Sequence, residues 1–253
     1  VLAHAAALIR AGQQAAAQAR VVRAWRTMPM NATSQALFLA EYELLLRSHH
    51  AARLDAMLWQ RKHTEARQMF DLVDAELVAL AETRMALQQR EGDVNRMINA
   101  LPNKFGTHPG LTRDRFEWRI RKGFVDDAKD LLLATSTSAE ALGRPESWAN
   151  RRRALARGEM RSGDPERAYR MASQHFLTEG SQYADLEWLS GYIALRFLKK
   201  PAVAYRHFLN HDTAVQSPIS QGRAGYWKGR ALEAMGNSEG ASVAYGEGAK
   251  YQT

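Results

Sequence analysis

The chain has 253 residues, of which 45% are hydrophobic, and it carries a formal net charge of +8 at pH 7. It contains no cysteine, which excludes disulfide bonds and thiolate sites, whether catalytic or metal-binding. No apolar run reaches the roughly 18 to 20 residues that span a bilayer, so we expect no membrane span. Alanine, leucine, arginine, glutamate and glutamine abound while β-branched residues are scarce, which favours helices over strands.

The first residues, VLAHAAALIRAG, already follow an amphipathic helical pattern. They show neither the basic leading region nor the cleavage site of a signal peptide, so we expect a mature or trimmed start. The absence of cysteine is compatible with an oxidising compartment but does not require one.

One pattern recurs along the whole chain. A turn residue is followed five positions later by an alanine (by Met97 in one weaker copy) and four positions after that by another apolar residue. Lys199, Ala204 and Phe208 show it clearly. The turn positions of the seven copies are Gly12, Arg61, Gly92, Gly123, Gly163, Lys199 and Gly236, at separations of 31 to 49 residues. Self-similarity at such periods is typical of stacked helix pairs.

The periodicity predicts an all-α fold, a right-handed superhelix (solenoid) of irregular helix-hairpin units similar to tetratricopeptide repeats. We expect one continuous solenoid. Residues 1–144 would form an irregular helical-repeat segment, and residues 145–253 a second one that carries the family likeness given below. Because a solenoid of hairpins usually offers a surface rather than a reactive centre, the pattern indicates a scaffold.

Two of the turns also carry start signals for the next helix. Asp164 and Ser238 are the predicted caps, and Pro165 suits a first helical turn. The last copy of the pattern is the most complete, because Gly229, Gly236, Ala241, Tyr245 and Gly248 follow the small and large positions of a tetratricopeptide hairpin. We interpret Gly225 and Gly229 as a place where two helices pack closely.

Positive charge is concentrated in the middle of the chain. Seven arginines fall between Trp148 and Arg170, among them the run Arg151, Arg152 and Arg153. Such a stretch attracts polyanions, although a solvated helix face is the more frequent explanation. Nucleic acid is not an expected partner, because no recognition helix, stacking-aromatic motif or code-like repeat accompanies the arginines.

Six tryptophans are spread along the chain. In helix-pair repeats an indole usually fills the gap between successive hairpins, and its N–H finds a partner. The alternative is a stacking platform for sugar rings or peptide side chains. Trp148 and Trp188 are the better candidates for that role, since each lies beside polar and charged residues.

The sequence predicts neither a catalytic centre nor a metal site. His207 and His211 share one helical face, as in some zinc sites, but the glutamate of a metalloprotease helix is absent and no third ligand is evident. Glu179, Asp185 and Glu187 are carboxylates of the kind that glycosidases use. In a solenoid, such residues more often serve solubility or pair with arginine. We therefore expect no cofactor.

From residue 145 onward the chain carries a series of short motifs in a distinctive order. They include Trp148, Arg152, Gly163-Asp164, Ala168-Tyr169, His175, Tyr183-Ala184-Asp185, Glu187-Trp188-Leu189, Gly191, His207-Phe208, Pro218-Ile219-Ser220, Tyr226-Trp227 and Gly229-Arg230-Ala231. In this order and spacing they resemble the bacterial soluble lytic transglycosylases, specifically the helical superhelix that precedes the catalytic domain. Residues 1–144 resemble that family only as generic helical hairpins.

The resemblance implies a periplasmic enzyme of a Gram-negative bacterium. Such enzymes cleave peptidoglycan between N-acetylmuramic acid and N-acetylglucosamine and leave 1,6-anhydro ends. In that family the catalytic glutamate lies in a Glu-Ser motif, followed by a Gly-Leu-Met-Gln segment, within a lysozyme-like domain after the superhelix. This combination is absent here, so no residue inherits the catalytic role.

We therefore expect the non-catalytic part of a larger lytic transglycosylase, inactive alone. The candidate murein-binding residues are Arg151, Arg152, Arg153, Trp148 and Trp188. The expected partners are peptidoglycan, the enzyme's own lysozyme-like domain and other cell-wall proteins. The alternative is a stand-alone tetratricopeptide-like adaptor that binds a peptide or helix in its groove.

Overall fold

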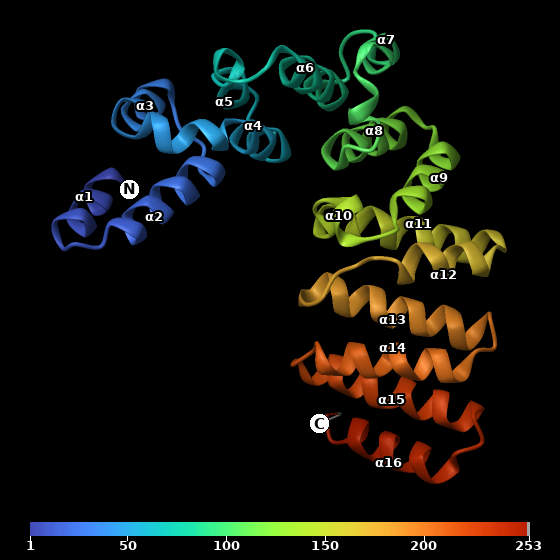
Figure 1. The fold of residues 1–253 in the computed structure, drawn as a ribbon. Helices are drawn as coiled ribbons and strands as arrows, with labels where there is room; N and C mark the ends of the chain where they lie inside the picture. Colours follow the sequence, from blue (N-terminus) through green and yellow to red (C-terminus); the bar gives the residue numbers. More distant parts are fainter. Residues whose placement is uncertain (252–253) are drawn as a thin grey trace. The chain divides into compact units, whose positions relative to one another are not determined.

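The computed structural model describes residues 1–251, and throughout them the chain forms helices joined by turns, without a β-strand (Figure 1). The expected all-α class is confirmed. Gln252 and Thr253, which end the stretch that carries the family likeness, lie outside the described residues. Within residues 1–251, none of the helices combines the length and the apolar character that crossing a membrane needs.

The chain divides into two compact units, residues 1–123 and the residues from Phe124 onward. The helices of the first unit are α1 (Leu2–Arg10), α2 (Gln14–Thr27), α3 (Ala32–Leu46), α4 (His50–Trp59), α5 (His63–Arg67), α6 (Ala75–Gln89), α7 (Val94–Ala100) and α8 (Pro109–Lys122). Its short 3-10 turns are η1 (Arg47–His49), η2 (Phe70–Leu72) and η3 (Asn103–Phe105).

The helices of the second unit are α9 (Val125–Thr135), α10 (Ala139–Leu142), α11 (Ala149–Ser162), α12 (Pro165–Ser173), α13 (Gly180–Arg196), α14 (Pro201–Thr213), α15 (Pro218–Ala234) and α16 (Ser238–Ala249), with the 3-10 turn η4 (Pro145–Ser147) before α11. The pairs α11–α12, α13–α14 and α15–α16 follow one another along this unit (Figure 1). Each helix therefore packs mainly on its neighbours in sequence.

The boundary between residues 1–144 and 145–253, which marks where the family likeness begins, falls inside the second unit. Side chains on either side of that position share one core, because the indole N–H of Trp148 donates to the carbonyl oxygen of Leu142 at 3.1 Å. Arg152 likewise reaches back to the Ser136 hydroxyl at 2.6 Å. The family likeness begins at residue 145, but the packing does not change there.

All seven turn residues of the recurring pattern have positive φ. The φ values are +71° to +102° at Gly12, Gly92, Gly123, Gly163 and Gly236, and +58° and +55° at Arg61 and Lys199. A left-handed residue at the end of a helix allows the chain to turn back. The alanines five positions later, from Ala17 to Ala241, are at most 2% exposed. The pattern therefore marks helix ends and close helix contacts.

The predicted helix caps are confirmed in one case and wrong in the other. The Asp164 carboxylate accepts a hydrogen bond from the Arg167 N–H at 2.9 Å and so caps α12. At α16 the cap is Asn237, whose side-chain oxygen accepts from the Gly240 N–H at 2.9 Å. Ser238 is already the first helical residue, one position too late for capping.

Helices α15 and α16 approach so closely that glycine is required at the contact. A Cβ atom on Gly225 would lie 2.5 Å from the Cα atom of Gly248. One on Gly229 would lie 2.3 Å from the Tyr245 ring. The predicted close packing at Gly225 and Gly229 is therefore confirmed, against backbone in the first case and an aromatic ring in the second.

A buried ion cluster ties three helices of the first unit together. Arg84 of α6 is 1% exposed and donates to Asp114 of α8 at 2.8 Å and to Asp55 of α4 at 2.6 Å. A Cβ atom on Gly110 would lie 2.4 Å from the guanidinium carbon, so α8 can pass this close only with glycine there. The two carboxylates offset the cost of burying the arginine charge.

Replacing Arg61 with glycine should stabilise the chain, because an L-residue at φ +58° has a backbone strain that glycine lacks. We expect the free energy of unfolding to rise by about 0.5 to 1 kcal/mol in urea denaturation. Gly163→Ala is the matched opposite change. A Cβ atom there meets nothing within 4 Å, so only the backbone conformation opposes it, and we expect a loss of about 1 kcal/mol. Unchanged stability in both variants would contradict the left-handed turns.

Alanine at Gly225 should destabilise the second unit by about 2 kcal/mol or more, because its Cβ atom would overlap the backbone of α16. Gly246→Ala in α16 is the control, since a Cβ atom there meets nothing within 4 Å. Helix propensity alone then predicts a gain of about 0.5 to 1 kcal/mol. Thermal unfolding followed by circular dichroism measures both changes. Equal effects of the two alanines would argue against the close contact.

Candidate functional site

The predicted murein-binding residues occupy different environments in the structure. Trp148 and Arg152 have 0% exposure, so they cannot contact a polymer outside the fold, and their assignment to a binding surface is corrected. Arg152 follows Trp148 by about one helical turn, which directs both side chains into the core. Arg151 is exposed, and Arg153 and Trp188 are half-buried. The structure therefore separates the three consecutive arginines.

Arg152 lies in the core and joins the C-terminal ends of two helices by hydrogen bonds. It donates to the carbonyl oxygen of Met171 in the last turn of α12 at 2.8 Å and to the hydroxyl of Ser136, which ends α9, at 2.6 Å. Burial lowers the pKa of Arg152 to about 9, so it remains protonated at neutral pH. The negative end of the α12 dipole stabilises that charge. In the first unit, Arg53 similarly donates to the Trp25 carbonyl near the end of α2.

Arg153 and Trp188 are already engaged with neighbouring side chains. Arg153 of α11 forms an ion pair with Asp185 of α13, the arginine pairing that the sequence indicated for such a carboxylate. Trp188 stacks on Tyr192 with ring centroids 5.3 Å apart, and the guanidinium carbon of Arg223 lies 5.6 Å from its ring centroid. Little of the Trp188 ring is left for a sugar to stack on.

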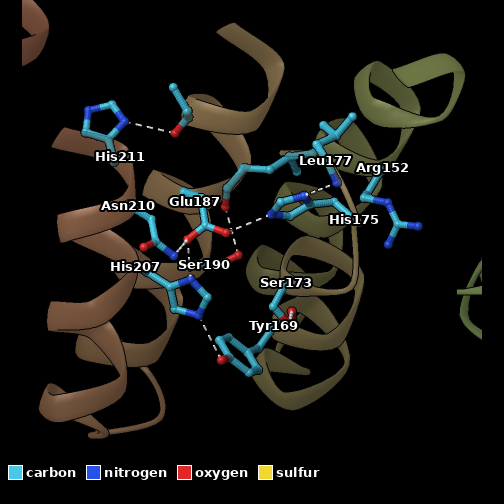
Figure 2. Close-up of polar contacts among 12 residues, drawn as sticks. Arg152, Tyr169, Ser173, His175, Leu177, Glu187, Ser190, His207, Asn210 and His211 are labelled. Carbon is cyan, nitrogen blue, oxygen red and sulfur yellow. Dashed lines mark hydrogen bonds and ion pairs between the residues drawn. The ribbon is translucent and has the colours of Figure 1, made fainter. Parts of the chain in front are cut away.

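A group of polar side chains in the second unit surrounds Glu187 of α13, which is 5% exposed (Figure 2). Its Oε1 accepts from Nε2 of His175 at 2.9 Å. Its Oε2 accepts from Nδ1 of His207 at 2.7 Å and from the Asn210 amide at 3.0 Å. Tyr169 of α12 continues the chain of contacts, since its hydroxyl lies 2.9 Å from Nε2 of His207.

These contacts determine which atoms carry protons. The Leu177 N–H donates to Nδ1 of His175 at 3.0 Å, so that nitrogen has no proton and Nε2 must carry the one donated to Glu187. His207 faces the Glu187 carboxylate with Nδ1, and its Nε2 lies 2.9 Å from the Tyr169 hydroxyl. The cluster is a single ionised carboxylate surrounded by donors.

The electrostatics of Glu187 suit a structural anion. Burial alone would raise its pKa, but the three hydrogen-bond donors outweigh burial and lower the pKa to about 2, from an ordinary value of 4.5. A glycosidase general acid needs the opposite shift, so that it holds a proton at neutral pH. Both oxygens are also occupied. Glu187 therefore connects α13 with α14 and with the segment that follows α12, and it is not available for proton transfer to a sugar.

The two histidines that share a helical face have separate partners. His207 contacts Glu187, whereas His211 donates from Nδ1 to the carbonyl oxygen of Ala184 at 2.9 Å. Burial lowers the pKa of His211 and favours its neutral form. Among residues 1–251, no group of three or more histidine, aspartate or glutamate side chains is arranged to hold a metal ion.

The candidate Glu179 and another glutamate, Glu146, lie at the surface. Glu179 is exposed at the start of α13. Glu146 is exposed in η4, where the hydroxyl of the adjacent Ser147 donates to the Arg144 carbonyl oxygen at 2.7 Å. This Glu-Ser pair is followed by the helix α11 and not by a Gly-Leu-Met-Gln segment. Neither glutamate has the buried surroundings that raise a carboxyl pKa.

Sequence reasoning missed the Glu187 cluster and a row of arginines on α11, formed by Arg153, Arg157 and Arg161. The members of the cluster were visible only as separate motifs, because Tyr169, Glu187 and His207 lie on three different helices. Arg157 was one of the seven arginines between Trp148 and Arg170, for which a solvated helix face was the more frequent explanation. The signal that could have found the arrangement is the spacing of four residues from Arg153, which places both side chains on one face of α11.

Glu187→Gln should destabilise the second unit by about 2 to 4 kcal/mol at pH 7, because the new amide places a donor against donors. The folded-state pKa is depressed, so the stabilisation from ionised Glu187 is present above pH 4.5 and is lost as the pH falls toward about 2. This contribution is about 3 kcal/mol. The stability difference between wild type and variant should therefore shrink over this range.

Urea denaturation at several pH values measures that difference. Glu179→Gln is the matched control, because it makes the same change on an exposed side chain at the start of the same helix. It should alter stability by less than about 0.5 kcal/mol. A Glu187→Gln difference that is independent of pH, or no larger than that of the control, would contradict an ionised and fully bonded Glu187.

Comparisons with known proteins leave the family open. No family model matches the chain, and neither a curated protein nor a solved structure shows significant similarity to it. The function is therefore inferred from the residues and contacts described above.

Proposed function

We propose that this chain is the non-catalytic helical part of a periplasmic lytic transglycosylase, a tetratricopeptide-like superhelix that positions murein or partner proteins for a lysozyme-like domain. The proposal starts from the sequence likeness of residues 145–253. The all-helical second unit is compatible with it, since its helices pack in successive pairs.

The observation that carries the proposal is where the residues of the likeness lie. Trp148, Arg152 and Glu187 are buried and make the hydrogen bonds that join α11–α14 to their neighbours. Gly191 leaves room for the Phe208 ring, because a Cβ atom there would lie 2.6 Å from that ring. A shared scaffold requires residues of this kind, since each fixes one hairpin against the next. The residues that carry the family likeness therefore hold the helices together, and they do not form a reactive site.

The exposed arginines supply the second element of the proposal. Arg151 is exposed and Arg153 half-buried, and peptidoglycan stem peptides carry carboxylates that such side chains attract. Arg152 contributes nothing to this surface, because it is buried. Murein contact in this proposal is electrostatic and weak at each residue, as suits a surface that orients a polymer.

Sedimentation with insoluble peptidoglycan sacculi tests the proposal. The chain should co-sediment at low salt and much less at high salt, because exposed ion pairs are screened. Arg151→Ala with Arg153→Ala should weaken binding by about threefold to tenfold. Arg20→Ala with Arg26→Ala removes the same charge from exposed positions of α2 and is the control. Arg152 stays unchanged, since alanine there would remove core hydrogen bonds.

Three outcomes would count against the proposal. Release of 1,6-anhydro-muropeptides by the pure chain would show that it is not the non-catalytic part. Equal losses in the two double variants would show non-specific charge attraction. No co-sedimentation at either salt would show that the chain does not position murein. The second candidate, an adaptor that binds another protein, would then remain. The arginine-rich surface described in the next subsection favours that candidate.

A further inference from the structure

Three arginines form a row along the surface of α11. Arg153, Arg157 and Arg161 are each four residues apart, so their side chains share one face of the helix. The ion pair between Arg153 and Asp185 shows that this face is turned toward α13. Arg157 and Arg161 are exposed. The row therefore runs along the α13 side of α11 and remains open to a partner.

A fourth arginine reaches the same part of α13 from the other side. Arg223 of α15 lies over Trp188, which is three residues after Asp185 on α13. The surroundings of Arg157 agree with this convergence. Burial lowers its pKa first, and the positive charges of Arg153, Arg161 and Arg223 lower it further. Like charges are thus gathered on one surface across α11, α13 and α15.

This surface has an excess of positive charge. Asp185 is paired with Arg153, and within residues 1–251 the structure gives Arg157, Arg161 and Arg223 no carboxylate at ion-pair distance. Holding like charges together without counter-charges is unfavourable for the free chain. An acidic partner would relieve that repulsion. We therefore expect the molecule that binds this surface to carry negative charge.

An aromatic row borders the arginines. The Trp227 ring centroid of α15 lies 6.0 Å from that of Trp188 and 5.2 Å from that of Tyr192. Tyr226, 44% exposed, lies beside Trp227, and Arg230 donates to its hydroxyl at 3.1 Å. Because the rings pack mainly against one another, they form an apolar edge with few open ring faces. Nucleobases need open ring faces for stacking, so this edge favours aliphatic or aromatic side chains of a polypeptide.

We propose that this arginine–aromatic face, formed by Arg153, Arg157, Arg161, Arg223, Trp188 and Tyr226, binds an extended acidic segment of a partner protein. Residues four apart on a helix are separated by about 6 Å along the axis. Alternate residues of an extended peptide are about 6.6 Å apart and point to the same side. A segment with acidic residues at alternate positions therefore matches the arginine row, and its apolar side chains lie against the aromatic edge.

Fluorescence anisotropy with a short labelled peptide of alternating glutamate and valine tests this inference. The control peptide has the same composition with its glutamates consecutive, and we expect it to bind several-fold more weakly. Arg157→Ala with Arg161→Ala should weaken binding of the alternating peptide by about tenfold. Arg20→Ala with Arg26→Ala, which removes equal charge from α2, should change it by less than about twofold. Circular dichroism verifies that both double variants are folded.

The inference is overturned if both peptides bind alike and both double variants lose the same affinity, because that result reports net charge alone. It is also overturned if the alternating peptide does not bind. Stronger binding of single-stranded RNA or of soluble murein fragments through Arg157 and Arg161 would assign the face to that polymer instead. The inference does not rest on the murein proposal, since the sacculi experiment alters Arg151 and Arg153 and leaves Arg157 and Arg161 intact.

Discussion

Each of the seven turns of the recurring pattern depends on one residue in the left-handed conformation. This conformation lets the next helix begin within a few residues and pack back on the one before it. Glycine adopts it at low cost, whereas Arg61 and Lys199 adopt it with backbone strain. The strain persists because the alanine five positions later, such as Ala66 or Ala204, is fully buried against the neighbouring helix. Turn geometry and close packing thus support each other.

Buried charges provide the second level of organisation. Arg84 in the first unit and Arg152 and Glu187 in the second are each surrounded by partners from other helices. Apolar packing alone tolerates many similar arrangements of two helices, but a buried charge is stable only where its particular partners meet it. We infer that these groups select one arrangement of each helix pair. Among the described residues the buried charges balance, so the net charge of +8 belongs to the more exposed side chains. The buried cations are Arg53, Arg84, Arg152 and Lys228, and the buried carboxylates are Asp114, Glu117, Glu159 and Glu187.

The sequence predicted the turns and close contacts because they depend on local chemistry. Small residues such as Gly225 and Ala241 fit where two helices lie close together, so their positions in the sequence indicate close contacts. Arg152 escaped prediction because the run of three arginines looks like a solvated surface. Consecutive residues on a helix point about 100° apart, so the middle arginine can be buried while its neighbours are not. The Glu187 cluster escaped because its members converge only through tertiary packing.

The short sequence distances bridged by these clusters affect how the protein folds. His175 and Glu187 are 12 residues apart, and Tyr169 and His207 are 38 apart. Closing loops of this size costs little entropy, so neighbouring helices can associate early in folding without waiting for distant segments. The short sequence distances also affect how the protein unfolds under mechanical load. We expect the second unit to yield from its α15–α16 end one helix pair at a time, with graded resistance instead of a single barrier.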